Sequence, residues 1–284
     1  MAVSVHTLTL PAPAKLNAFL HVTGRRDDGY HTLESVLVAI DRCDLVSLEL
    51  RDDGAIRRTS GLNGIADSDD LAVRAARLLQ DHARSTLGAS IGIDKRLPVA
   101  AGLGGGSSDA ATVLLGLNRM WSLRMSRRAL MDLALELGAD VPFFVFGEPA
   151  FADGIGERLV PITFPPTWFT VLTPGTEVST ASIFAAPELT RHSDSVKMAL
   201  FSEGYGRNDL YGVAAARFPE IAHHRDALAR EAPRSGARMT GSGGCVFAAF
   251  DSEYGARQAL SRMPRGVAGF VARSLARHPL WSYA

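Results

Sequence analysis

The chain has 284 residues, enough for one large domain or two ordinary ones, and its 30 basic and 30 acidic residues balance. This balance gives no reason to expect a nucleic acid or an anionic membrane as a partner. The two cysteines lie far apart without zinc-ligand spacing, no signal peptide opens the chain, and no apolar run reaches membrane-spanning length, so we expect a cytoplasmic protein without a disulfide scaffold or a zinc site.

The first half of the chain alternates between patterns typical of strands and of helices. Short apolar runs rich in β-branched residues predict strands, whereas apolar side chains at helical spacing predict helices. The helix predicted at residues 126–137 has the clearest ends, because Ser126 is a favourable N-cap and Gly138 follows its final turn. The expected strands are residues 16–22, 45–50 and 89–94, and the expected helices are residues 67–87, 110–121 and 126–137.

A cluster of prolines at Pro161, Pro165 and Pro166 interrupts the pattern after residues 151–160. We place a boundary there, which divides the chain into an N-terminal lobe of residues 1–160 and a C-terminal lobe of residues 161–284. Strands and helices mix without strict βαβ alternation, so the sequence favours an α+β fold over a doubly wound sheet. The second lobe is expected to contain strands at residues 168–173, 244–250 and 267–273, and helices at residues 222–230 and 253–263.

A glycine-rich loop at residues 98–108 is the strongest chemical feature of the sequence. Its four glycines between Gly102 and Gly106 leave a backbone that can adopt positive φ and lie directly against a ligand. Ser107 or Ser108 is expected to cap the helix that follows. Such a loop directs free N–H groups and the positive end of a helix dipole toward one point, which binds phosphate, although a simple tight turn has the same composition.

Two common nucleotide-binding patterns do not fit this loop. A Walker A loop ends in Gly-Lys-Ser/Thr, but no lysine follows Gly106. A dinucleotide fingerprint requires an acidic residue at the end of the next strand, but Asp132 falls inside a predicted helix. The loop therefore favours neither a P-loop enzyme nor a nicotinamide-dependent oxidoreductase.

Three further features are candidates for a functional site, and the first of them indicates a cleft between the two halves of the chain. A second loop of small residues, 240–244, precedes a predicted strand in the other half, and ligand sites favour the junction of two lobes. Lys15 lies among prolines and apolar residues, which makes an inward-facing ammonium more favourable than at an ordinary surface lysine. Asp140 follows Gly138 and Ala139, where it can cap a helix, act as a catalytic carboxylate, or do both.

Five motifs that occur in order give the chain a recognisable signature. They are PAKLN at residues 13–17, GYHTL at 29–33, the glycine loop, GADVP at 138–142 and TGSG at 240–243. Together they resemble the GHMP kinase superfamily over about residues 11–271. The motifs around Lys15 and around Tyr30 and His31 resemble one branch of it, whose members act in the non-mevalonate route to isopentenyl diphosphate.

The resemblance implies a two-lobed GHMP kinase fold of the α+β class. Its N-terminal lobe is expected to be like the second domain of ribosomal protein S5 and its C-terminal lobe to be ferredoxin-like. The implied activity is transfer of the γ-phosphoryl of ATP, with Mg²⁺ as the accompanying ion, to the 2-hydroxyl of a diphosphocytidyl-methylerythritol substrate. The implied partners are these two small molecules alone, in a monomer or weak homodimer.

The same resemblance implies the residues of the site. Lys15 and Asp140 match a catalytic pair, in which the aspartate accepts or orients the hydroxyl proton and the lysine meets developing negative charge. The residues implied for the substrate are Asn17, Tyr30, His31, Thr180 and Phe184, with cytosine facing the aromatic rings. The residues implied for ATP are Lys95 with Pro98, Val99, Ala100, Ala101, Gly102, Leu103, Gly104, Gly105, Gly106, Ser107 and Ser108. Metal ligands stay unassigned.

Two alternatives stay open at this point. One is another GHMP kinase that acts on a mevalonate-like or sugar alcohol, against which Tyr30, His31 and Phe184 favour a substrate with a pyrimidine. The other is a catalytically silent nucleotide-binding regulator. The presence of both Lys15 and Asp140 favours an active kinase over such a regulator.

Overall fold

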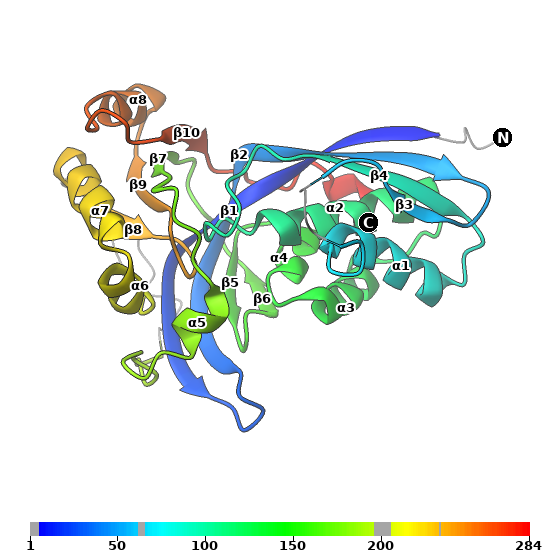
Figure 1. The fold of residues 1–284 in the computed structure, drawn as a ribbon, viewed down its shortest axis with the longest axis horizontal. Helices are drawn as coiled ribbons and strands as arrows, with labels where there is room; N and C mark the ends of the chain where they lie inside the picture. The colour runs from blue at the N-terminus through cyan, green and yellow to red at the C-terminus, as the bar shows by residue number, and fades with distance from the viewer. Residues whose placement is uncertain (1–5, 62–65, 196–205, 233) are drawn as a thin grey trace.

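A computed structural model describes residues 6–61, 66–195, 206–232 and 234–284 of the chain. Two sheets dominate it, and a long two-stranded ribbon formed by β1 and β2 runs through the first of them (Figure 1). Within the described ranges, none of the helices has the length and apolar character needed to cross a membrane.

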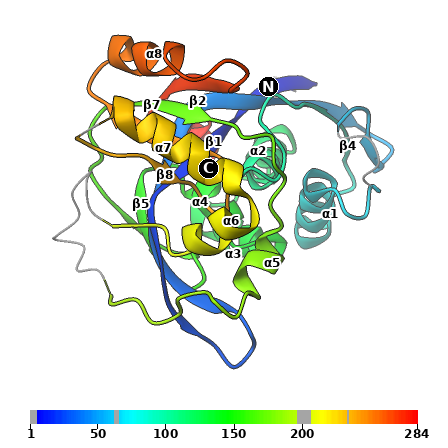
Figure 2. The ribbon, with the colours of Figure 1, turned by 60° about the vertical axis from the view of Figure 1, so that its left-hand side comes forward.

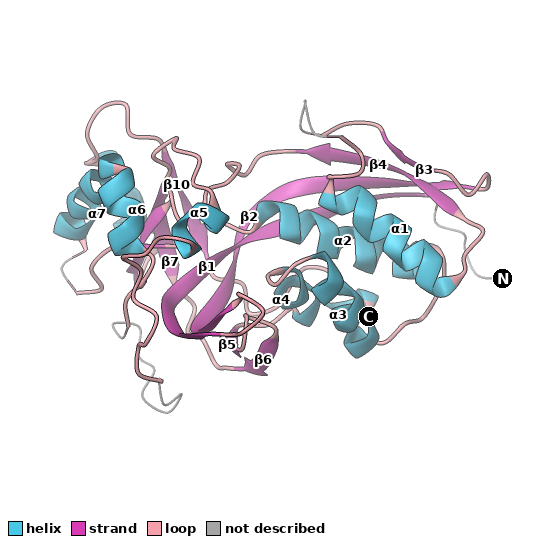
Figure 3. Cartoon of the chain, turned by 60° about the horizontal axis from the view of Figure 1, so that its bottom comes forward, coloured by secondary structure: helices cyan, strands magenta, loops and turns pink. Residues whose placement is uncertain are grey.

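The first sheet has the strand order β3-β4-β2-β5-β6, with β1 paired to β2. The pairing of β3 with β4 is parallel and all its other pairs are antiparallel. Helices α1 to α4 lie together on one side of this sheet (Figure 3). The bounds are β1 Thr7–Arg25, β2 His31–Arg51, β3 Ile56–Arg58, β4 Gly88–Asp94, β5 Ala150–Asp153, β6 Arg158–Pro161, α1 Leu71–Ala83, α2 Gly105–Met120, α3 Arg127–Leu137 and α4 Val141–Phe146.

The second sheet has four antiparallel strands in the order β10-β7-β9-β8. Helices stand between β7 and β8 and between β9 and β10, so the order along the chain is that of a ferredoxin-like β-α-β-β-α-β unit. Helices α6, α7 and α8 gather around this sheet (Figure 2). The bounds are β7 Trp168–Leu172, α5 Thr180–Phe184, α6 Tyr211–Arg217, α7 Pro219–Glu231, β8 Arg238–Met239, β9 Val246–Phe250, α8 Glu253–Ser261 and β10 Gly269–Arg273.

A buried apolar cluster joins the two sheets. Leu16 of β1, Leu103 of the glycine loop, and Phe169 and Phe247 of the second sheet pack into it. Burial of such side chains contributes about 1.5–3 kcal/mol each, so the cluster fixes the glycine loop against both sheets. Lys15, the neighbour of Leu16 in β1, is thereby held at the junction.

The end of the chain returns to the helices of the first sheet. A short 3₁₀ helix at Trp281–Tyr283 follows β10, and Arg127 Nη2 donates to Trp281 O at 2.5 Å. Asn118 Nδ2 donates to Tyr283 O at 3.1 Å, and Leu280 is buried in the core of the first sheet.

The α+β class and the two-sheet architecture expected from the sequence are confirmed, while the division at residue 160 stays a prediction.

Candidate active site

A cavity of 480 Å³ opens at the junction of the two sheets. Its walls come from β1 and β2, the glycine loop, the start of α1, the segment before α4, helix α5 and the loop at residues 241–242. Among the described residues, Ser108, Tyr30 and His31 do not line it, whereas the other residues expected at the site do. Those lining residues are Lys15, Asn17, Lys95, Pro98, Val99, Ala100, Ala101, Gly102, Leu103, Gly104, Gly105, Gly106, Ser107, Asp140, Thr180 and Phe184.

The glycine loop passes directly into α2, earlier than the sequence pattern predicts. The helix begins at Gly105, and its N-cap is Gly104, whose φ of 70° turns the chain into the first helical turn. The expectation that Ser107 or Ser108 caps this helix is wrong, because both lie inside it. Gly104 has no side chain with which to cap the first amides, so α2 presents them and its positive end toward the cavity.

The two glycine loops of the sequence contact one another. Cys245 N donates to Ala101 O at 3.1 Å, and Thr240 Oγ1 donates to Gly102 O at 3.3 Å. A Cβ on Gly102 would stand 2.2 Å from Thr240 O, and the φ of Gly102 is 77°. Only glycine fits at that position, and the second loop therefore fixes the path of the first.

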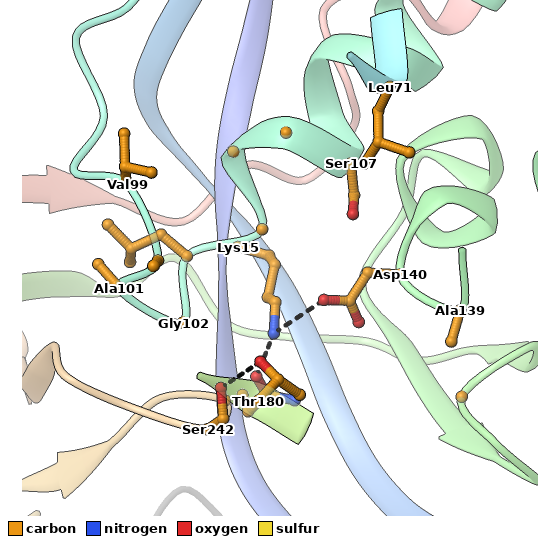
Figure 4. Close-up of a pocket in the computed structure, with 18 of the residues that line it drawn as sticks. Lys15, Leu71, Val99, Ala101, Gly102, Ser107, Ala139, Asp140, Thr180 and Ser242 are labelled. Atoms are coloured by element: carbon orange, nitrogen blue, oxygen red, sulfur yellow. Dashed lines mark hydrogen bonds and ion pairs between the residues drawn. The ribbon is translucent and has the colours of Figure 1, made fainter. Parts of the chain in front are cut away.

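Lys15 and Asp140 face each other in the cavity, as Figure 4 shows. Lys15 Nζ lies 3.5 Å from Asp140 Oδ2, and the backbone N–H of Lys15 donates to Leu103 O at 2.9 Å. Asp140 occupies the N-cap position of α4, but its carboxylate makes no capping hydrogen bond there. The side chain of Asp140 is therefore left to the cavity and to Lys15.

Asn17 holds the ammonium of Lys15 in place. Lys15 Nζ donates to Asn17 Oδ1 at 2.5 Å, and Asn17 Nδ2 donates to Ser35 Oγ at 2.8 Å. The backbone N–H of Asn17 donates to Thr240 Oγ1 at 3.0 Å, which brings in the second glycine loop. The sequence pattern missed the part played by Ser35, since only the pairing of β1 with β2 brings it beside Asn17.

Lys95 lies in the cavity wall between two carboxylates. Its Nζ donates to Asp109 Oδ2 at 2.8 Å and pairs with Asp44. The other oxygen of Asp44 accepts the backbone N–H groups of Arg96 at 2.6 Å and Leu97 at 2.8 Å, which fixes the approach to the glycine loop. Burial raises the pKa of Asp109 to about 7, and the two carboxylates hold the pKa of Lys95 above its ordinary value although burial opposes them.

The aromatic residues expected around cytosine are only partly brought together. The rings of His31 and Phe184 are in contact, with centroids 5.1 Å apart and planes 30° apart. Tyr30 lies at the turn between β1 and β2, where 60 % of it is exposed. Thr180 Oγ1 lies 2.7 Å from Ser242 Oγ, so that α5 is tied to the second glycine loop. Arg191 donates to His31 and was not expected at the site.

Two comparisons of sequence agree with this geometry. The family models of the GHMP kinases N terminal domain and the GHMP kinases C terminal match residues 70–148 and 197–268. The chain is 58% identical over 273 residues to the 4-diphosphocytidyl-2-C-methyl-D-erythritol kinase of Thiobacillus denitrificans, covering 96% of this chain and 97% of that one. It is 52% identical to the protein of the same name from Nitrosospira multiformis, covering 98% of this chain and 94% of that one.

Solved structures give the same result. A crystal structure of 4-(cytidine 5'-diphospho)-2C-methyl-D-erythritol kinase matches with a TM-score of 0.80 and 33% identity over 94% of this chain and 99% of that one. A homoserine kinase from Cytophaga hutchinsonii shares the fold, with a TM-score of 0.76 and 16% identity over 98% of this chain and 97% of that one. The chain therefore belongs to the GHMP kinases, in the family of the 4-diphosphocytidyl-2-C-methyl-D-erythritol kinases.

Proposed function

We propose that this kinase transfers the γ-phosphoryl group of ATP to the 2-hydroxyl of 4-diphosphocytidyl-2-C-methyl-D-erythritol. The observation that carries the proposal is the meeting of Lys15 and Asp140 in a cavity whose wall is the glycine loop. Phosphoryl transfer requires a positioned hydroxyl, a cradle for the phosphates and stabilisation of charge, with little covalent chemistry from the protein.

In this proposal, the phosphates of ATP lie against the glycine loop. The open N–H groups at the start of α2 and the positive end of this 16-residue helix favour an anion there. The absence of side chains between Gly104 and Gly106 lets phosphate oxygens approach the backbone. Lys95 lies beyond this turn, where its ion pairs with Asp44 and Asp109 fix it in the cavity wall.

The acceptor hydroxyl is placed at Asp140. The carboxylate accepts the hydrogen of the 2-hydroxyl, orients the oxygen toward the γ-phosphorus and receives the proton as the new P–O bond forms. The bond from the γ-phosphorus to the bridging oxygen breaks, and ADP leaves with that electron pair. Lys15, held by Asn17, meets the negative charge that develops on the transferred group.

Mg²⁺ is expected with ATP, and the donors in the cavity fit it. No group of three or more His, Cys, Asp or Glu that would bind a metal occurs in the described parts of the chain. This suits Mg²⁺, which is commonly held by one or two protein oxygens together with substrate phosphates and water. Ser107 lines the cavity with its hydroxyl directed toward Asp140 (Figure 4), and it would hold the ion there. When bound, the ion neutralises phosphate charge.

The cytidine end of the acceptor is assigned to Tyr30, His31, Phe184 and Thr180. Phe184 and Thr180 line the cavity, and the ring of His31 packs on Phe184. Tyr30 presents an exposed ring from the turn of the long hairpin. Stacking of a base on aromatic rings contributes about 1–3 kcal/mol per base.

A coupled assay of ADP release tests the proposal against its alternatives. The purified chain is incubated with ATP, Mg²⁺ and, in parallel, 4-diphosphocytidyl-2-C-methyl-D-erythritol, mevalonate or galactose. ADP release that depends on the cytidine substrate alone is the expected result. Turnover of mevalonate or galactose would identify another GHMP kinase, and ATP binding without turnover of any acceptor would identify a silent regulator.

A further inference from the structure

Ser35 of β2 lies at the end of a chain of hydrogen bonds that begins at Lys15. Lys15 Nζ donates to Asn17 Oδ1 at 2.5 Å, and Asn17 Nδ2 donates to Ser35 Oγ at 2.8 Å. Ser35 Oγ in turn donates to Phe19 O at 2.6 Å. Lys15, Asn17 and Ser35 all line the cavity, and Ser35 is 1% exposed. The ammonium of Lys15 is therefore connected, through Asn17, to a buried hydroxyl of the neighbouring strand.

The pairing of β1 with β2 brings these groups together. Asn17 lies opposite Leu37, and Ser35 is two residues from Leu37 along β2, so both side chains can face the cavity that all three residues line. The register of β1 against β2 shifts between Asn17 and Phe19, and an irregularity of this kind re-aims side chains and backbone groups. Phe19 O, just beyond the shift, accepts from Ser35 Oγ.

The hydroxyl of Ser35 determines which way the amide of Asn17 points. It has a single hydrogen, which goes to Phe19 O, because a carbonyl oxygen can only accept. Ser35 Oγ must therefore accept from Asn17, which turns the NH₂ group of that amide toward Ser35. The amide oxygen then faces Lys15 Nζ, a group with three donors and no acceptor. A reversed amide would place two sets of donors against each other.

We propose that Ser35 is a positioning residue for phosphoryl transfer, because its hydroxyl fixes the direction of the Asn17 amide that holds the ammonium of Lys15 beside Asp140. This inference rests on the proposed function of the site. Ser35 acts on the reacting groups only through Asn17 and Lys15 in this account, so its loss should affect the rate of transfer rather than the binding of ATP.

The burial of Lys15 makes the direction of the amide important. A buried ammonium requires acceptors in place of the water that it has lost. Asn17 Oδ1 is the nearer one, at 2.5 Å, whereas Asp140 Oδ2 lies 3.5 Å from Nζ. With one N–H of Lys15 bound to Asn17, the other two are left for Asp140 and for the charge that develops on the transferred group.

Steady-state kinetics of Ser35→Ala tests the proposal. Its kcat is expected to fall about three- to tenfold, the factor that one hydrogen bond commonly provides, with an unchanged Kd for ATP. Ser47→Ala is the matched control, because Ser47 of β2 also donates to a backbone carbonyl, Gly92 O at 3.2 Å, but is not among the described residues that line the cavity. Its kcat should equal that of the parent.

A second background separates positioning from packing. In Lys15→Met there is no ammonium to hold, so addition of Ser35→Ala should cause no further loss of kcat. The effect of Ser35→Ala on the melting temperature should be the same in both backgrounds. An equal fold-loss of kcat in the parent and in Lys15→Met would show that Ser35 acts through packing, and it would overturn the proposal.

Two other substitutions keep the proposal testable if Ser35→Ala does not fold. Ser35→Thr retains a hydroxyl, whereas Ser35→Cys is close to serine in size but carries a thiol, which is a weak donor and a weak acceptor. Ser35→Thr should therefore keep most of the kcat of the parent, and Ser35→Cys should lose it. Equal values or the reverse order, in variants that melt at the temperature of the parent, would contradict the role of the hydroxyl.

NMR of the side-chain amide tests the geometry without turnover. In labelled parent protein, the Hδ2 hydrogens of Asn17 should show stronger nuclear Overhauser effects to Ser35 Hβ than to Lys15 Hε, and the reverse would overturn the inference. If the parent phosphorylates the cytidine substrate while Ser35→Ala keeps the kcat of the parent, only this inference falls and the proposed function stands. If the parent phosphorylates no acceptor, the proposed function itself falls.

Discussion

Lys15 Nζ and Asp140 Oδ2 lie 3.5 Å apart, but the side chain of Lys15 is 4% exposed and that of Asp140 is 44% exposed. The ammonium is thus enclosed and held by Asn17, while the carboxylate remains open to the cavity. An enclosed cation loses little freedom when charge develops beside it, which favours electrostatic stabilisation of a transition state. An accessible carboxylate can meet an incoming hydroxyl.

This pairing predicts the behaviour of a double-mutant cycle. Asp140→Asn is expected to lower kcat by about 100- to 10,000-fold, the usual contribution of a positioned acid–base group, and to leave ATP binding and the melting temperature nearly unchanged. Lys15→Met should also lose turnover, and the double variant should lose far less than the two penalties combined, because residues that act as a unit are not additive.

Asp132→Asn is the control for this cycle, since Asp132 is an exposed carboxylate on α3 that pairs with Arg128. Its kcat should equal that of the parent. Strictly additive penalties for Lys15 and Asp140 would show that the two residues act independently.

Gly106 offers a test of the phosphate cradle that does not disturb the fold. A Cβ there would have as its nearest neighbour Leu71 Cδ1 at 3.8 Å, an ordinary van der Waals distance, yet Gly106 lines the cavity. Gly106→Ala should keep the melting temperature and weaken ATP binding by at least about tenfold, because the methyl group stands where phosphate must approach. Calorimetric titration with ATP measures it.

Gly212→Ala serves as the matched glycine control. A Cβ at this position, the second residue of α6 as Gly106 is the second residue of α2, meets nothing within 4 Å, so ATP affinity and the melting temperature should both stay close to those of the parent. Equal ATP affinity in Gly106→Ala and the parent would argue against this turn as the phosphate site.

Because the ring of Tyr30 is exposed, its removal can distinguish a role in binding the cytidine substrate from a role in packing the fold. With 60 % of Tyr30 exposed, Tyr30→Ala should leave the melting temperature within a few degrees of the parent. It should raise the KM for the cytidine substrate several-fold and leave the KM for ATP unchanged, since a stacked base loses about 1–3 kcal/mol without its platform. Parallel weakening of both substrates, or no change in either, would remove Tyr30 from the cytidine site.

The buried imidazole of His278 makes the free energy of unfolding depend on pH. Burial, followed by the charge of Arg127, lowers the pKa of His278 to about 4 from 6.5. Between these values the unfolded chain binds the proton and the folded chain does not, so the contribution of His278 to stability is complete above pH 6.5 and is lost as the pH falls to about 4. The expected loss is about 3 kcal/mol.

His278→Asn isolates this effect. His278 Nδ1 accepts from Leu280 N at 3.1 Å, and the amide oxygen of Asn can take over that bond without titrating. Urea unfolding at a series of pH values should therefore show a shallower decline for the variant between about pH 6.5 and 4. Identical declines in parent and variant would show that His278 does not titrate with unfolding.

Local signals in the sequence predict much of the fold and of the site. Ser126 caps α3 by accepting from Ala129 N at 3.3 Å, and Gly138 ends that helix, both as expected. The glycine loop and Asp140 line the cavity. Both could be predicted as candidates because a cluster of glycines and a carboxylate after a helix end are visible in a short window of sequence.

Other parts depend on pairing between distant segments, which a short window does not contain. β1 runs through Pro11 and Pro13, residues that usually argue against a strand, and a register shift after Pro13 accommodates them. The sequence pattern predicts the start of α2 at residue 110, which is too late, because Gly105 and Gly106 are poor helix formers although the first turn tolerates them. Asp44 and Arg191 reach the site only through the fold, and nothing near them in sequence marks them.

Identification of the phosphorylated atom tests the central claim most directly. After incubation of the purified chain with ATP, Mg²⁺ and 4-diphosphocytidyl-2-C-methyl-D-erythritol, phosphorus–proton and phosphorus–carbon correlation NMR of the product locates the new phosphomonoester. The account predicts one phosphoryl group on the oxygen of carbon 2 for each ADP released, and no such product from Asp140→Asn on the same time scale. A phosphoryl group on any other hydroxyl, or release of inorganic phosphate with the acceptor unchanged, would contradict it.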